Sequence, residues 1–244
     1  MKKVLSLLLV LMLCPVFASA DPLELCEDLS VSISKPCDVN DPSAGTFVYC
    51  YRYPQVDDAA EGGAAINAFY QTAAHYEDTF NIERLEGADS STEISYTVTC
   101  NNDEYFSVLL RKEVTMLGKT KVIWSGHVFS RKNPNPDCTY TLPKLLNILA
   151  ADENEEWIQE HQNEKANEAV RSLVWEMIEE NMAGIEYDPD YLEEYLLEDL
   201  NPEEDYYLDE NGQPVFYLNP GVAAPVEFGL LTFPITLEEI DDEL

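Results

Sequence analysis

Apart from its carboxylates, this sequence offers few side chains for acid–base or metal chemistry. It contains three histidines, His75, His127 and His161, and no two of them stand at the spacing of metal ligands. No Gly-x-Ser-x-Gly motif marks a nucleophilic serine, although a Ser-His-Asp arrangement built from distant residues stays open. We interpret each histidine as an ordinary surface or partly buried imidazole.

The 47 aspartates and glutamates are too numerous for any pair to be singled out as catalytic. A glycosidase needs two carboxyl groups at a defined separation across a sugar cleft, and such crowding is more typical of a solvated face. The run Asp209-Glu210-Asn211-Gly212 has the composition of a calcium loop, but an EF-hand has glycine sixth and glutamate twelfth. Here glycine is fourth and Gln213-Pro214 follows, which favours a hairpin turn. We predict no catalytic residue, no cofactor and no metal site.

The charge of the chain restricts its partners. The formal net charge is −33, and it becomes −35 without Lys2 and Lys3. A chain this acidic is expected to be repelled by nucleic acid and by anionic membrane surfaces, and to attract cationic partners. The alternative is that the charge only keeps a secreted protein soluble.

The first twenty residues have the pattern of an export signal. Lys2 and Lys3 precede an apolar run at 5–17, and Ala18-Ser19-Ala20 fits the rule for signal peptidase cleavage. The run is shorter than the about 20 residues of a membrane span, and the bulky Leu13 disfavours a lipoprotein anchored at Cys14. We expect cleavage before Asp21, no membrane span afterwards, and a secreted or extracytoplasmic protein associated with the cell wall.

Five cysteines follow the signal, and export makes them disulfide candidates. An odd number leaves one thiol over, and the spacing does not fix the connectivity. No Cys-x-x-Cys pair suggests redox or zinc chemistry. The candidates are Cys26, Cys37, Cys50, Cys100 and Cys138.

The first half of the mature chain reads as a sheet with one helix. The stretch 46–56 alternates Phe47, Tyr49, Tyr51 and Tyr53 on one face and predicts a strand. A helix is expected from residue 64, with a buried stripe of Ile66, Phe69, Ala73, Tyr76 and Phe80. Three more strands at 92–100, 104–116 and 119–131 are expected to form an antiparallel meander.

The second half begins with a short apolar element at 140–149. A long helix is predicted at 155–182, ended by Gly184, followed by a short acidic helix within 187–205. Asn211-Gly212 predicts a β-hairpin, and a last strand at 230–235 precedes a frayed acidic tail. The predicted fold is α+β with two lobes: an antiparallel sheet with a packed helix, then a long helix against a β-hairpin sheet. The expected organisation is a signal peptide at 1–20, an N-terminal α+β lobe at 21–138 and a C-terminal α+β lobe with the acidic tail at 139–244.

Several motifs occur in an order that resembles a known family. They are YRYPQVDD, AAINAFY, YTLPKLL, DYYLDENGQPVFYLNP and AAPVEFGLLTFPI. Together they resemble the two-part RsiV-like extracytoplasmic module, which occurs in lysozyme-sensing anti-sigma factors and before the catalytic domain of certain peptidoglycan deacetylases. The resemblance covers most of the mature chain and implies a two-lobed α+β protein outside the membrane.

The resemblance also implies a contact surface in the loop after the hairpin. In the family this loop typically reads Pro-Tyr-Glu-x-Ala-Pro and contacts lysozyme. Pro220, Ala224 and Pro225 match it, whereas Gly221 and Val222 stand in place of the tyrosine and glutamate, so the aromatic anchor is missing. The candidate partner-binding residues are Asn219, Pro220, Gly221, Val222, Ala224 and Pro225.

These observations favour a secreted, non-catalytic binding module at the bacterial cell envelope. Its partner would be wall glycan or a cationic wall-active protein such as lysozyme. A cell-wall hydrolase or modifying enzyme, and a purely structural surface protein, stay as alternatives. Whether the loop at 219–229 is a buried connection or an exposed contact is open at this stage.

Overall fold

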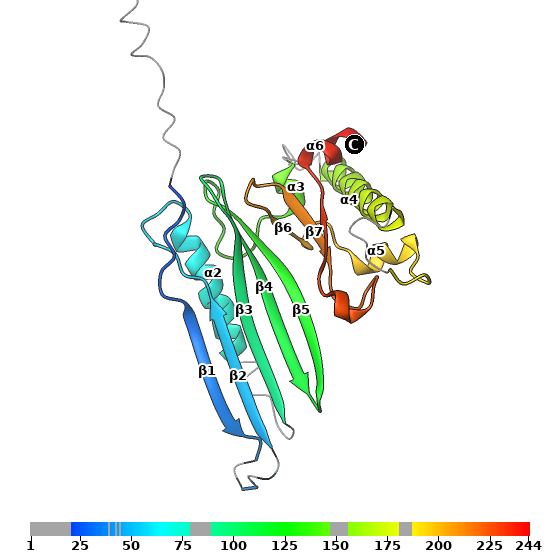
Figure 1. Ribbon diagram of the computed structural model, residues 1–244. Coiled ribbons are helices and arrows are strands. Elements are labelled where there is room, and N and C mark those ends of the chain that lie inside the picture. Colours follow the sequence, from blue (N-terminus) through cyan, green and yellow to red (C-terminus); the bar gives the residue numbers. More distant parts are fainter. Residues whose placement is uncertain are drawn as a thin grey trace, which may run out of the picture.

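The computed structural model describes residues 21–38, 40–41, 43, 45–78, 89–146, 156–180 and 187–244. It contains a five-stranded sheet carrying one helix, and a three-stranded sheet accompanied by the remaining helices (Figure 1). The predicted α+β fold is confirmed. Within these ranges no helix combines the length and apolar character needed to cross a membrane.

The larger sheet has the order β1-β2-β3-β4-β5. Its strands are β1 (Leu29–Pro36), β2 (Thr46–Tyr53), β3 (Ser90–Asn101), β4 (Tyr105–Met116) and β5 (Lys119–Ser130). The meander of β3, β4 and β5 is antiparallel as predicted, whereas β2 and β3 pair in parallel. A parallel pair requires a crossover, and helix α2 (Gly63–Tyr76) lies between these two strands in the sequence. Strand β1 was not predicted.

The aromatic alternation on β2 forms one side of the first core. Phe47, Tyr49, Tyr51 and Tyr53 are all buried, as predicted. The ring of Tyr53 stacks on that of Tyr70 from α2, with 5.4 Å between centroids. Burial of these large rings supplies the hydrophobic free energy that holds the helix on the sheet.

The predicted stripe of α2 is partly wrong. The buried residues are Gly63, Ile66, Asn67, Tyr70 and Ala74, and Tyr76 is 56% exposed. Asn67 can occupy a core position because its side chain accepts from Val56 N–H at 3.0 Å and donates to Val56 C=O at 2.7 Å. Phe80 lies outside the described residues.

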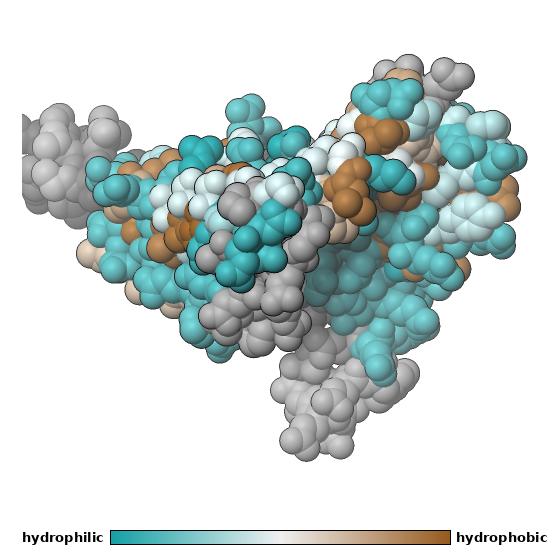
Figure 2. All heavy atoms as spheres, turned by 90° about the horizontal axis from the view of Figure 1, so that it is seen from below, coloured by the Kyte–Doolittle hydropathy of each residue, from teal (hydrophilic) through white to brown (hydrophobic). Residues whose placement is uncertain are grey.

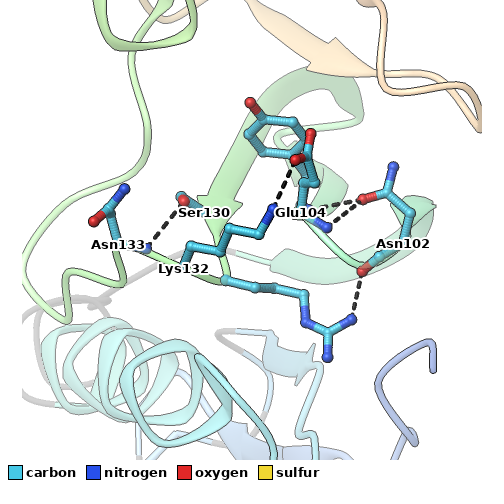
Figure 3. A network of polar contacts seen from close by, with 7 residues as sticks. Asn102, Glu104, Ser130, Lys132 and Asn133 are labelled. Atoms are coloured by element: carbon cyan, nitrogen blue, oxygen red, sulfur yellow. Dashed lines mark hydrogen bonds and ion pairs between the residues drawn. The ribbon is translucent and has the colours of Figure 1, made fainter. Parts of the chain in front are cut away.

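Arg131, directly after β5, ties three distant segments together. Its side chain is buried and donates to the backbone carbonyls of Asp21, Glu61 and Asn102. Around it, Lys132 forms an ion pair with Glu104 at 2.7 Å, and the Asn102 side chain accepts from Glu104 N–H at 2.9 Å (Figure 3). The start of the described chain is thereby fixed to one end of the sheet.

The smaller sheet belongs to the second half and has the order β6-β7-β8. Its strands are β6 (Tyr206–Leu208), β7 (Pro214–Leu218) and β8 (Leu231–Pro234). The predicted hairpin is confirmed, and Gly212 in its turn has a φ of +77°. Such a left-handed conformation suits glycine.

Helices cover this smaller sheet. The predicted long helix is α4 (Glu156–Glu179), with Val170, Val174 and Ile178 buried. The short apolar element contains α3 (Leu142–Leu145), and the acidic one is η4 (Glu193–Tyr195) continued by α5 (Leu196–Asp199). The predicted helix stop at Gly184 lies outside the described residues.

The prediction of a frayed tail is wrong. Residues Leu237–Glu243 form helix α6, and the Ile240 side chain is fully buried. A capping box begins the helix, since Thr236 and Glu239 hydrogen-bond each other's backbone N–H groups. The apolar Ile240 among carboxylates was the signal for this helix.

The two lobes meet on the face of the larger sheet opposite α2. Cys100 and Val128 contribute to the core of the C-terminal lobe, whereas Phe106 and Val108 contribute to the core beneath α2. At Gly126 the strands touch backbone to backbone, because a Cβ there would lie 1.8 Å from the carbonyl oxygen of Tyr206. Only glycine permits this approach.

Candidate functional site

The loop after β7 begins with a residue that belongs to the interface between the lobes. Asn219 accepts from Trp124 N–H at 2.7 Å and donates to Trp124 C=O at 3.3 Å. Its amide is thus used in joining β7 to the edge strand β5. Asn219 was predicted to bind a partner, and its side chain is instead engaged within the protein.

The middle of the loop enters the core and its end emerges from it. Ala223 and Ala224 are buried, and the Ala223 carbonyl accepts from Asp188 N–H at 2.9 Å. Beyond them Pro225 is exposed, and Val226 and Phe228 are 64% and 41% exposed. The loop is therefore both a buried connection and an exposed surface, divided at residue 225.

A groove of about 460 Å³ lies between this loop and the segment 187–189. It is lined by Tyr187, Asp188, Pro189, Gly221, Val222, Ala224, Pro225 and Val226. Four predicted contact residues, Gly221, Val222, Ala224 and Pro225, thus share one groove. Pro220 is half-buried and does not line it. We call this feature the loop groove.

The loop groove combines apolar walls with acidic surroundings. Asp188 lines it, and burial raises the pKa of the neighbouring Tyr187 hydroxyl. The same lobe exposes Leu192, Tyr195 and Leu197 among carboxylates of η4 and α5. Seen from below, apolar side chains form small separate patches in a mostly hydrophilic surface (Figure 2). Such a groove suits a partner with an apolar side chain and positive charge nearby.

A second, more polar groove of about 490 Å³ runs beside α4 and was missed by sequence reasoning. It is lined by Glu160, His161, Asn163, Glu164, Asn167, Arg171 and Glu203. Asn167 donates to Glu203 at 3.2 Å, and Arg171 donates to the Leu200 carbonyl at 3.2 and 3.3 Å. These contacts attach α4 to the segment after α5. Glutamates four residues apart on a helix are common on solvated faces, so the sequence carried no distinctive signal.

The histidines are placed as the sequence suggested. His75 and His161 are exposed, and His127 is partly buried between Phe69 and Tyr70. Desolvation lowers the pKa of His127 to about 4. Its Nδ1 lies 3.3 Å from the Tyr70 hydroxyl, so the ring serves as an aromatic packing element.

In the described ranges, no group of three or more His, Cys, Asp or Glu side chains is arranged to hold a metal ion. The run that resembles a calcium loop is a turn: Asp209 Oδ1 accepts the backbone N–H groups of Asn211 and Gln213, each at 2.9 Å. One carboxylate oxygen is thus committed to the hairpin. This agrees with the interpretation as a turn.

No disulfide joins the predicted candidates within the described part of the chain. Cys26 and Cys138 are exposed, Cys37 and Cys50 are partly buried, and Cys100 is buried. Cys100 points into the core of the C-terminal lobe, where burial raises its thiol pKa to about 11. Cys50 instead lies next to Ser32, 3.4 Å from its hydroxyl, on another part of the sheet. Cys50 pairs with Glu93, seven residues before Cys100 on β3, so the strand register keeps these two cysteines apart.

Comparisons with known proteins identify the fold. No family model matches the chain, and no curated protein matches its sequence. A DUF3298 family member from Bacteroides fragilis has a similar solved structure, with a TM-score of 0.52 and 12% identity over 92% of this chain and 94% of that chain. A DUF3298 family protein from Pseudomonas aeruginosa gives a TM-score of 0.52 and 14% identity over 91% and 94%. The chain therefore has a fold similar to that of DUF3298 family proteins.

Proposed function

We propose that this protein is an exported, non-catalytic binding module of the bacterial cell envelope. It would act like the RsiV-like extracytoplasmic module, with its loop groove contacting a cationic wall-active protein such as lysozyme. The observation that carries the proposal is the loop groove itself, an apolar recess in the surface of a strongly acidic chain. An apolar side chain of the partner would occupy the recess, and the negative field would speed its encounter.

Export rests on the signal pattern at 1–20, and the contacts of the chain directly after the predicted cleavage site are compatible with its removal. The Asp21 carbonyl accepts from Arg131 at 3.0 Å, and Leu23 exchanges two hydrogen bonds with the Asn101 side chain at 2.8 and 2.9 Å. These contacts involve the residues that directly follow the predicted cleavage site. Cleavage before Asp21 would leave all of them in place.

A pull-down with lysozyme tests the partner. We expect retention at low salt that weakens at moderate salt, since screening shortens the range of the field. Val226→Arg should reduce retention about tenfold by filling the groove and adding repulsion. Val48→Arg is the matched control, because Val48 is an exposed valine on strand β2 outside the groove.

The two variants separate contact from bulk charge. If both variants lost retention equally, charge alone would govern retention, and the loop groove would be ruled out as the binding site. No retention of the unmodified protein in either buffer would remove lysozyme as the partner. Sedimentation with purified peptidoglycan then tests wall glycan, with the same pair of variants.

A further inference from the structure

The turn between β4 and β5 contains an unusual backbone conformation. Leu117 has a φ of +52°, and it is the one residue other than glycine with a positive φ in the described ranges. Gly118 follows with a φ of +73°. A two-residue hairpin turn with both φ values positive favours asparagine or aspartate at its first position. Leucine is disfavoured there because its Cβ crowds the backbone and its side chain makes no compensating hydrogen bond.

The strain at Leu117 is not offset by packing inside the protein. Its side chain is 77% exposed, and that of the preceding Met116 is 52% exposed. A Cβ at Gly118 would meet no atom within 4 Å, so the turn is open on that side. A strained apolar residue that is largely exposed is a candidate for contact with another surface.

Two lysines accompany the apolar pair. Lys119 pairs with Met116 across the hairpin, and Lys121 pairs with Val114 one step further along. Both lysines are exposed, and neither joins an ion pair among the described residues. We define Met116, Leu117, Gly118, Lys119 and Lys121 as the hairpin tip. It is a small apolar and basic surface on a chain that is otherwise acidic.

The hairpin tip is also well placed for contact. Strands β4 and β5 each span 12 residues, and the C-terminal lobe contacts β5 at Trp124, Gly126 and Val128, from the middle of the strand toward its other end (Figure 1). Asp21 lies at that far end too, because it and the β3–β4 turn residue Asn102 both bind Arg131. Neither the C-terminal lobe nor Asp21 therefore obstructs the tip.

We propose that the hairpin tip docks onto an anionic phospholipid surface. Leu117 and Met116 would enter the boundary between headgroups and acyl chains, and Lys119 and Lys121 would reach the phosphates. The net charge of the chain opposes such docking. However, the Debye length is about 8 Å at physiological salt, so carboxylates at the far end of the sheet are largely screened. Asp89 lies near the tip, directly before Ser90, which pairs with Met116, and it opposes the two lysines only in part. This inference is independent of the loop groove.

Vesicle sedimentation tests the proposal with the purified chain from residue 21 onward, which excludes the apolar run at 5–17. The probes are vesicles of phosphatidylglycerol mixed with phosphatidylcholine, and vesicles of phosphatidylcholine alone. We expect binding to the anionic vesicles and weaker binding to the neutral ones. Replacing Lys119 and Lys121 by glutamine should weaken binding to anionic vesicles by about fivefold per lysine.

Leu117→Asn separates docking from folding. Asparagine tolerates the left-handed conformation better than leucine, so thermal stability should be unchanged or higher while vesicle binding falls severalfold. Leu197→Asn is the matched control, since Leu197 is a 65% exposed leucine on α5, and it should bind like the unmodified protein.

Three results would overturn the proposal. One is absence of binding to either kind of vesicle, and another is equal binding by the Leu117→Asn and Leu197→Asn variants. The third is a dimer in analytical ultracentrifugation that dissociates on Leu117→Asn without any vesicle binding. That outcome would assign the hairpin tip to contact with a second copy of the chain.

Discussion

The side-chain amide of Asn219 holds both backbone groups of Trp124, accepting from its N–H at 2.7 Å and donating to its C=O at 3.3 Å. Two neighbours along β5 are held in the same way. Gly126 N–H donates to the Tyr217 hydroxyl at 2.8 Å, and Val128 C=O accepts from Tyr140 N–H at 2.7 Å. β5 is an edge strand, and edge strands with free backbone groups promote aggregation. The C-terminal lobe therefore stabilises the larger sheet by covering this edge.

Asn219→Leu should lower the free energy of unfolding by about 2 kcal/mol, because two partly buried backbone groups lose their partner. Asn219→Asp should also be destabilising, because it keeps the acceptor for Trp124 N–H but places a carboxylate oxygen against Trp124 C=O. Urea denaturation measures both. Asn211→Ala is the control, because Asn211 is an exposed turn residue. If Asn219→Leu were no more destabilising than this control, the amide would not be holding the lobes together.

Gly126→Ala should be the most damaging small substitution in the sheet. The added methyl group would lie 1.8 Å from the Tyr206 carbonyl oxygen, so the lobes must separate or the strand must shift. We expect a loss of more than about 3 kcal/mol, seen as a lower melting temperature. Gly118→Ala serves for comparison, because open space surrounds it and only its φ of +73° is unfavourable. That variant should cost about 1 kcal/mol, and a similar loss at both positions would argue against the close approach.

His127 should make the fold sensitive to acid. Its pKa is about 4 in the folded protein because burial disfavours the charged ring, against about 6.5 in the unfolded chain. The unfolded state therefore binds the proton more readily, and stability falls as the pH drops from about 6.5 toward 4. The loss approaches a limit on the order of 3 kcal/mol.

The carboxylates titrate in part of the same range, so the measurement needs an internal reference. Unfolding free energies of the unmodified protein and of His127→Phe should be compared at pH 7 and pH 4. Phenylalanine suits the aromatic surroundings of Phe69 and Tyr70 and cannot be protonated. We expect the difference in unfolding free energy between the two proteins to shift in favour of the variant at pH 4. If this difference were the same at pH 7 and pH 4, His127 would not contribute to acid sensitivity.

Arg131→Met should destabilise the protein by about 3 kcal/mol. The variant keeps the aliphatic contacts but leaves the carbonyls of Asp21, Glu61 and Asn102 without this donor. Arg52→Met is the matched control, because the Arg52 side chain is 60% exposed and its ion pair with Asp28 spans 4.0 Å. The control should change stability by no more than about 0.5 kcal/mol. Hydrogen exchange near Asn101 and Asn102 should rise only in the Arg131 variant.

Local patterns in the sequence predicted the elements well where a single signal dominated. The aromatic alternation of β2 and the Asn211-Gly212 hairpin were confirmed, because each depends on neighbouring residues. The stripe of α2 was partly wrong, since the buried position of Asn67 depends on Val56, eleven residues away. A polar residue gives no hydrophobic signal even when its hydrogen bonds are satisfied in the core.

The contacts that define the candidate site are more distant still. Asn219 and Trp124 are 95 residues apart, and the loop groove needs segment 187–189 beside the loop at 221–226. The family resemblance directed attention to this loop. It could not tell that Asn219 is engaged inside the protein while Val226 is exposed. That distinction depends on the pairing of β5 with the C-terminal lobe, which no local pattern encodes.

The hydrogen bond between Arg131 and the carbonyl of Asp21 joins residues separated by 110 positions. During synthesis the amino-terminal segment therefore cannot bind Arg131 until the ribosome has added all strands of the larger sheet. Closing so long a loop is entropically unfavourable and slow compared with local contacts. The amino-terminal segment consequently reaches its final position only after β5 is complete, so this contact is expected to be among the last to form in the N-terminal lobe.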